Sequence, residues 1–148
     1  MNLGGKMDKL VEFLKNNDTL QCKKDNLILE EDIEKYEKKL NFNFGKELKK
    51  YILEYGFLAF KFVEFYGINK KQEFDSDMVK DTLKLNEQFP ETKSLIAFEN
   101  KGDGDYILLD SNDNVYEFDT NLDNGVVALQ KKLFEYILER FKEIDYVY

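Results

Sequence analysis

Three short apolar runs in the middle of the chain constrain its fold more than any other feature. SLIAFEN, DYILLD and NVYEFD cover residues 94–100, 105–110 and 114–119. The turns between them, KGDG and SNDN, carry the glycine and asparagine residues that tight turns need. Because strands joined by tight turns run antiparallel, this pattern predicts an antiparallel meander.

Helical spacing of apolar residues surrounds this meander. Four amphipathic helices are expected before it, over residues 7–17, 30–40, 46–55 and 75–89. The fourth has Ser76 or Asp75 as its cap and Met78, Val79, Leu83 and Leu85 as its apolar contacts. One long amphipathic helix is expected after the meander, over residues 124–144. Helices segregated from strands in this way predict an α+β fold over residues 1–148 as a single domain, with an antiparallel sheet flanked by N-terminal helices and a long C-terminal helix.

Residues 57–68, FLAFKFVEFYGI, are rich in aromatic and β-branched residues. They predict a strand or a bulged pair of short strands. The expected apolar face consists of alternate residues: Leu58, Phe60, Phe62, Tyr66 and Ile68. Glu64 interrupts this row, and a charge in such a place indicates either a bulge or a functional site.

The charge balance excludes several classes of function. The 148 residues have a net charge of −8 and no histidine, and Arg140 is the only arginine among 22 basic residues. Nucleic-acid binding needs a basic surface, so we expect a basic protein partner instead. Without histidine, the chain cannot form a Ser-His-Asp or Cys-His catalytic group or a histidine-bearing zinc site.

Cysteine content and hydropathy give the expected location. Cys22 is the only cysteine, so no disulfide within the chain is possible and a reducing compartment is expected. The N-terminal residues have no apolar run long enough for a signal peptide, and no stretch approaches the length of a membrane span. We therefore expect a soluble cytoplasmic protein that does not bind membranes.

The stretch from Asp103 to Asp123 has six aspartates, one glutamate and no lysine or arginine. Metal binding is one reading, but neither possible EF-hand register has glycine at position 6 or glutamate at position 12. Turns are the simpler reading, because Asp and Asn side chains bond their own backbone. We expect no metal and no cofactor.

Carboxylate catalysis is a second reading of the same stretch. Asp110, Glu117 and Asp119 fall where adjacent strands can bring them together, as glycosidases require of two carboxylates. Any acidic sheet offers such pairs by chance, so we expect no enzyme activity.

Presentation of negative charge is a third reading. Tyr106, Leu108 and Asp110 alternate with Asp105, Ile107 and Leu109, so one sheet face would mix carboxylates with apolar residues. Such a face, bordered by acidic turns, suits a basic partner. A solvated surface with no partner fits the same pattern, and the residues alone leave both alternatives open.

Two segments resemble the SUKH superfamily, which includes the Smi/Knr-like proteins. In residues 30–56 the spacing of Ile33, Glu37 and Leu40 and the ending Leu53, Tyr55 and Gly56 resemble the family's first two helices. Gly45 and Tyr55 stand where the family usually has proline and asparagine. Residues 95–119 resemble the family's central strands. The residues that fit the family's positions are Phe98, Gly104, Asp105, Tyr106, Asp110, Val115, Tyr116 and Asp119.

The resemblance implies a non-enzymatic α+β interaction domain. Many bacterial members look like immunity proteins that neutralise a toxin, often a nuclease, from neighbouring cells. Fungal relatives look like regulators of cell-wall synthesis, so a regulatory or scaffolding domain with an endogenous partner is the alternative. The acidic reading and the resemblance together give the expected partner-binding residues: Asp103, Asp105, Asp110, Glu117 and Asp119, with Tyr106 and Tyr116 as aromatic anchors or core residues, and Glu64 and Asp113 as secondary candidates.

Overall fold

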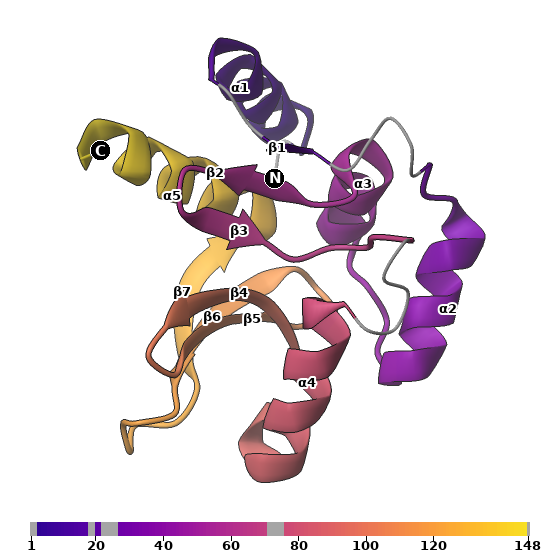
Figure 1. Cartoon of the computed structure of the whole chain (residues 1–148), viewed down its shortest axis with the longest axis vertical. Coiled ribbons are helices and arrows are strands. Elements are labelled where there is room, and N and C mark those ends of the chain that lie inside the picture. The colour runs from indigo at the N-terminus through magenta and orange to yellow at the C-terminus, as the bar shows by residue number, and fades with distance from the viewer. Residues whose placement is uncertain (1–2, 18–19, 22–26, 71–75, 148) are drawn as a thin grey trace.

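Helices and two antiparallel sheets build the fold (Figure 1). The computed structural model describes residues 3–17, 20–21, 27–70 and 76–147. In chain order the elements are α1 (Leu3–Asn16), β1 (Leu20–Gln21), α2 (Glu30–Leu40), α3 (Lys46–Tyr55), β2 (Leu58–Phe60), β3 (Val63–Phe65), α4 (Asp77–Gln88), η2 (Pro90–Thr92), β4 (Ile96–Gly102), β5 (Asp105–Leu109), β6 (Asn114–Asp119), β7 (Val127–Lys132) and α5 (Leu133–Val147). The predicted α+β class is confirmed, as are the antiparallel strands and the C-terminal helix.

The predicted meander is confirmed and forms most of the larger sheet. This sheet has the order β4-β5-β6-β7, and the smaller sheet has the order β1-β2-β3. A β-bulge at Phe98 joins the two sheets, since β4 pairs with β5 through Ala97 and Glu99 and skips Phe98. The Phe98 carbonyl instead accepts a 2.7 Å hydrogen bond from the backbone N–H of Tyr66, just beyond β3.

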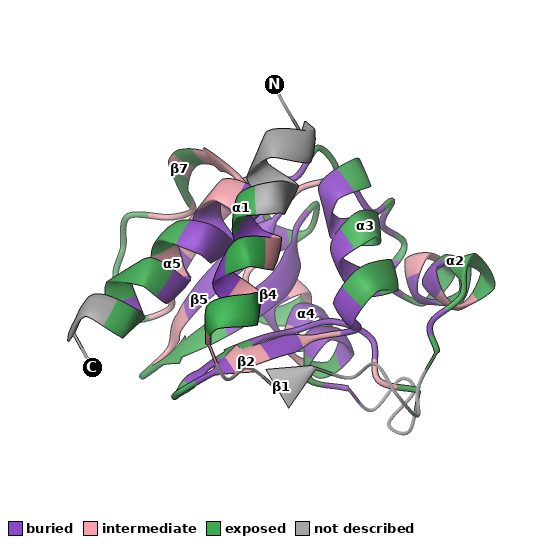
Figure 2. Cartoon of the chain, turned by 90° about the horizontal axis from the view of Figure 1, so that it is seen from above, coloured by how far each residue is buried: buried purple, intermediate pink, exposed green. Residues whose placement is uncertain are grey.

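Aromatic rings fill the space between the sheets and the helices. Phe65 lies at the centre of this packing, with ring centroids 5.0 Å from Phe98 of β4 and 4.9 Å from Phe141 of α5. Further ring contacts extend the cluster to α1, β2 and α3 through Phe13, Phe60 and Tyr51. Figure 2 shows bands of buried residues along α3 and α5, so each helix turns one face toward this core.

Helices cover both faces of the larger sheet. On one face Phe89, at the end of α4, contacts Phe118 of β6, with ring centroids 5.0 Å apart. On the other face α5 reaches β4, where Tyr136 donates a hydrogen bond to Glu99. All four residues from Tyr106 to Leu109 of β5 are consequently buried. The apolar part of the expected mixed face is therefore covered, while its carboxylates Asp105, Glu117 and Asp119 stay partly exposed at the end of the sheet.

The prediction of one helix over residues 124–144 is wrong in its first half. Residues 127–132 form strand β7, which pairs with β6 at Glu117↔Val127 and Asn114↔Lys132. β7 is an edge strand with little burial on either face, so its residues do not alternate in polarity. Sequence periodicity could not separate this strand from the helix that follows at Leu133.

The predicted apolar face of residues 57–68 changes phase at a turn. β2 and β3 form a hairpin around Lys61, at φ 55°, and Phe62. Phe62 is 65% exposed, and the buried residues of β3 are Val63 and Phe65. The two turn residues reset the alternation, which leaves Glu64 on the exposed side of β3.

The fourth helix begins after one of its two predicted caps but packs differently from its prediction. α4 starts at Asp77 with Ser76 at the N-cap position, but the Ser76 side chain makes no capping hydrogen bond. Asp75 lies outside the described residues. Thr82, not Leu83, completes the buried face, and its Oγ1 accepts a 2.8 Å hydrogen bond from the backbone N–H of Ala97.

Two buried carboxylates fix the positions of α3 and α5. Asp113, in the β5–β6 turn, accepts hydrogen bonds from the first backbone N–H groups of α3, at Glu47 (2.9 Å) and Leu48 (3.0 Å). The Glu47 side chain in turn accepts a 2.8 Å hydrogen bond from the backbone N–H of Phe134 in α5. Each carboxylate thereby caps a helix that is distant in the sequence.

Gly45 makes the first of these caps possible. A Cβ atom at this position would lie 2.3 Å from the Asp113 carboxylate, much closer than any van der Waals contact allows. Glycine at position 45 therefore leaves room for a cap of α3 that comes from another part of the chain.

We expect Asp113→Asn to lower the free energy of unfolding by ~2 kcal/mol, because an amide leaves one of two buried N–H groups without an acceptor. Asn tolerates the positive φ of 65° at this position, so backbone strain does not contribute. Urea denaturation measures the change, with the exposed Asp123→Asn as the control. Equal stability of the two variants would contradict the capping role.

Candidate functional site

Four of the predicted carboxylates gather at one end of the larger sheet. Asp103 lies in the β4–β5 turn, Asp105 begins β5, and Glu117 and Asp119 lie on β6. Strand pairing places Asp105 opposite Asp119. We call Asp103, Asp105, Glu117 and Asp119 the acidic end. Lys101 is the basic residue that this structure places among them, with Nζ 3.3 Å from Glu117 Oε2 and 3.9 Å from Asp105 Oδ2.

Asp105 and Glu117 repel one another within the acidic end. Partial burial raises the pKa of Asp105 to about 6, and the neighbouring Glu117 carboxylate raises it further than Lys101 lowers it. Within the described part of the chain, Asp105 Oδ1 is buried without a hydrogen-bond partner. The fold therefore holds two carboxylates close together at a cost to its own stability.

The turns at the acidic end are held by local hydrogen bonds. Asp119 Oδ1 accepts a 2.9 Å bond from the backbone N–H of Asn121, and Asn121 Nδ2 donates a 2.6 Å bond to the Asp103 carbonyl. Gly104 adopts φ 84°, and a Cβ there would lie 2.3 Å from Thr120 Oγ1. These contacts fix the backbone of both turns and leave the Asp103 side chain exposed to solvent.

Asp110 and Tyr116 lie at the opposite end of the β5–β6 hairpin. The Asp110 carboxylate accepts hydrogen bonds from Asn112, Asn114 and the Tyr116 hydroxyl, at distances from 2.9 to 3.0 Å. Burial alone would raise the pKa of Asp110, but these hydrogen bonds hold it below its usual value. Asp110 thus organises the turn that carries Asp113.

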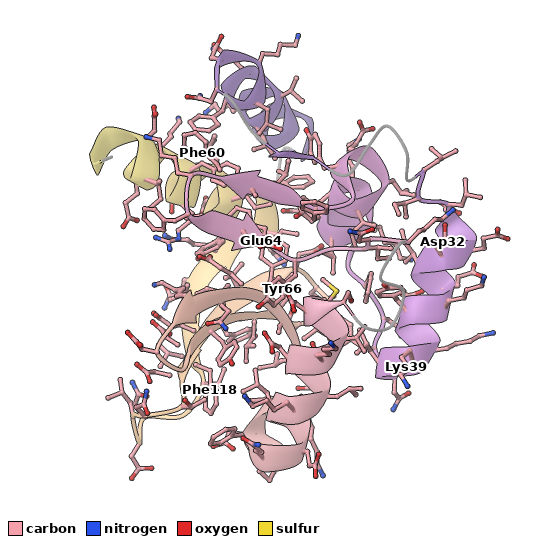
Figure 3. All side chains as sticks on the ribbon, viewed as in Figure 1. Asp32, Lys39, Phe60, Glu64, Tyr66 and Phe118 are labelled. Carbon is pink, nitrogen blue, oxygen red and sulfur yellow. The ribbon has the colours of Figure 1, made fainter. Side chains whose placement is uncertain are left out.

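The remaining predicted residues are separate from the acidic end. Asp113 is 5% exposed and caps α3, and Tyr106 is 7% exposed in the core. Glu64 is exposed on β3, close to the start of α4 (Figure 3). The structure therefore brings together four of the nine predicted residues and places the other five elsewhere.

Sequence reasoning missed a buried ion pair beside the acidic end. Glu99, 2% exposed, accepts a 2.5 Å hydrogen bond from the Tyr136 hydroxyl and pairs with Arg140, whose Nε and Nη2 each lie 3.1 Å from Glu99 Oε2. The signal available was that the one arginine falls on the closing helix, where its side chain can pair with a carboxylate in the apolar run of residues 94–100. This pair anchors α5 to β4.

Two further observations concern metals and membranes. Across the described ranges, no group of three or more Cys, Asp or Glu side chains is arranged to hold a metal ion. Among the helices in the same ranges, none has the length and apolar character to cross a bilayer.

The fold and the site define an α+β protein whose sheet presents a group of carboxylates at one end. Residues 7–142 match the family model described as "SUKH_5: SMI1-KNR4 cell-wall", which covers nearly the whole chain. The chain therefore belongs to the SUKH family, and the resemblance seen in its sequence is confirmed. A comparison with curated proteins gave no match. Membership is consistent with a toxin-immunity role and with binding of a protein partner.

We expect Asp105→Asn to stabilise the fold near neutral pH by ~1 kcal/mol, a value reduced from the full pKa shift because the site is partly solvated. The folded pKa of about 6 exceeds the ordinary 3.8, so the wild-type protein loses stability as pH rises from about 4 to about 6. The gain from Asp105→Asn should be present above pH ~6 and absent below pH ~4.

Urea denaturation at several pH values measures this gain, and Asp123→Asn is the control for loss of an exposed carboxylate. A gain that does not change with pH would contradict the assigned repulsion between Asp105 and Glu117.

Proposed function

We propose that this protein is an immunity-type inhibitor that binds and neutralises a cognate toxin domain and performs no catalysis itself. The observation that carries the proposal is the acidic end, where the fold keeps four carboxylates together with one lysine. Selection for stability alone would remove a carboxylate whose pKa is raised by burial and by the neighbouring Glu117. A partner that supplies positive charge gives this arrangement a use.

A nuclease toxin fits this surface. Such an enzyme presents a basic site to the phosphates of its substrate, and carboxylates on a rigid sheet end can occupy that site in their place. The net charge of −8 also speeds the encounter with a basic partner through long-range attraction. We place this encounter in the cytoplasm, because that compartment is reducing and the chain has a single cysteine that forms no disulfide within it.

The predicted residues have different parts in this proposal. Asp103, Asp105, Glu117 and Asp119 contact the toxin directly. Asp110, Asp113 and Tyr116 support the hairpin from its other end, and Tyr106, within β5, packs in the core. Glu64 lies on a separate surface and is considered below.

A regulatory or scaffolding domain with an endogenous partner is the alternative function. The observation that favours it is the description of the matching family, which refers to the cell wall. An endogenous partner predicts a growth or envelope phenotype on deletion in the absence of any toxin, whereas an immunity protein predicts sensitivity only when the toxin is present.

The decisive test is a binding titration against the toxin-like domain encoded beside this gene, at low and high salt. The test variant combines Asp103→Asn, Glu117→Gln and Asp119→Asn, which keeps the side-chain acceptor that the 119–121 turn uses. The control variant combines Glu34→Gln, Glu54→Gln and Glu87→Gln, three exposed carboxylates on other elements. Both variants lose the same charge.

We expect the test variant to bind at least ~10-fold more weakly and with less dependence on salt, because close charge pairs at the interface are lost. The control should lose only a small part of the long-range attraction. Equal weakening in the two variants would show that net charge, and not the acidic end, drives binding. Absence of binding by the wild-type protein would contradict the proposed function for that toxin.

A further inference from the structure

A second acidic feature lies in a cleft between the β2–β3 hairpin and the start of α4. The cleft has a volume of about 180 Å³, and the residues that line it include Phe57, Ala59, Glu64, Tyr66, Ser76 and Asp77. Pockets for drug-sized ligands typically measure about 300–1,000 Å³. This cleft has room for a single side chain.

Ser76 is the polar group in the cleft that the fold leaves unused. It occupies the N-cap position of α4, where a serine oxygen usually accepts a backbone hydrogen bond, but it makes none. Its residue is 4% exposed, and within the described residues its Oγ is buried with no hydrogen-bond partner. Because native structures pair nearly all buried hydroxyl groups, this atom indicates a ligand that supplies the missing partner.

The charge of the cleft identifies the sign of that ligand. Glu64 and Asp77 both line it, and they lie near enough for the Asp77 charge to add to the effect of burial in raising the pKa of Glu64. Lys61, on the same hairpin, instead lies near Asp145 of α5, with Nζ 3.8 Å from Oδ1. Among the described residues that line the cleft, none is lysine or arginine. The cleft therefore favours a cation.

The walls of the cleft distinguish an organic cation from a metal ion. Phe57 and Ala59, both partly exposed, supply apolar surface, which a hydrated metal ion does not use and the aliphatic part of a lysine or arginine does. The Tyr66 ring is held in place by a 2.7 Å hydrogen bond from its hydroxyl to Asp81. An aromatic ring fixed beside a cation adds a favourable cation–π contact.

We propose, as an extension of the proposed function, that this cleft receives one lysine or arginine side chain of the protein partner. The cationic head lies between the Glu64 and Asp77 carboxylates and donates a hydrogen bond to Ser76 Oγ. The aliphatic stem packs against Phe57 and Ala59. Figure 3 shows Glu64 of β3 and Tyr66, just beyond β3, above α4. The acidic end belongs to other strands, β5 and β6, and to the β4–β5 turn.

The experiment uses the whole protein and two small probes of matched shape. Argininamide carries the guanidinium group, and citrullinamide replaces that group with a neutral urea. Titration of each into ¹⁵N-labelled protein follows the backbone signals of Ser76, Asp77, Met78 and Asn69 by NMR. We expect argininamide to bind with a dissociation constant on the order of millimolar, and citrullinamide to bind at least ~10-fold more weakly.

Variants test which groups make the site. Glu64→Gln with Asp77→Asn should weaken argininamide binding at least ~5-fold, while the control Glu54→Gln with Glu87→Gln, which loses the same charge at exposed positions, should not. Ser76→Ala removes an oxygen that the folded helix does not use, and it should weaken binding ~3-fold or more. Equal binding of the two probes, or equal weakening by the control, would overturn the proposal.

Two more outcomes separate this proposal from the proposed function. If Ca²⁺ shifts the same NMR signals at millimolar concentration while argininamide does not, the cleft is a metal site and the proposal is wrong. If the toxin domain binds and the Glu64→Gln, Asp77→Asn variant retains full affinity for it, the proposed function stands and the cleft has no part in it. If argininamide binds as expected but no toxin does, the cleft stands and the proposed function fails.

Discussion

The fold depends on buried carboxylates that accept hydrogen bonds from helix ends far away in the sequence. Asp113 caps α3, and Glu47, in the first turn of α3, caps α5. Each contact satisfies backbone N–H groups that a helix cannot satisfy by itself, and each aligns a negative charge with a helix dipole. Together these hydrogen bonds connect the β5–β6 hairpin to α3, and α3 to α5. Gly45 allows this arrangement because any larger residue would overlap the Asp113 side chain.

Much of this fold follows from local patterns in the sequence, and the remainder depends on contacts between distant segments. The helices at residues 30–40 and 46–55 and the meander were predictable because each has clear periodicity and turn residues of its own. β7 was not predictable, because an edge strand with little burial lacks alternation and its only distinguishing feature is its pairing with β6. The acidic end was predicted as a set of residues, yet the capping role of Asp113 was not, since its partners lie 65 and 66 residues away.

The carboxylates of this chain differ in how well their surroundings satisfy their charge. Glu99, Asp110 and Asp113 each have several donors, and their charges are neutralised by an arginine, by a turn or by a helix end. Asp105 has a like-charged neighbour and a buried oxygen without a partner among the described residues. In the proposed function, Asp105 and its acidic neighbours are the carboxylates that contact the partner. That contrast, more than the net charge, distinguishes the acidic end from an ordinary solvated surface.

The β5–β6 hairpin carries its structural and its proposed binding residues at opposite ends. Asp110 organises the turn and Asp113 holds it to α3, whereas Asp105 and Asp119 face each other at the far end of the strands. Substitutions at the far end leave every capping bond untouched. Charges at the far end of the hairpin can therefore change over evolutionary time, while the scaffold that displays them stays the same.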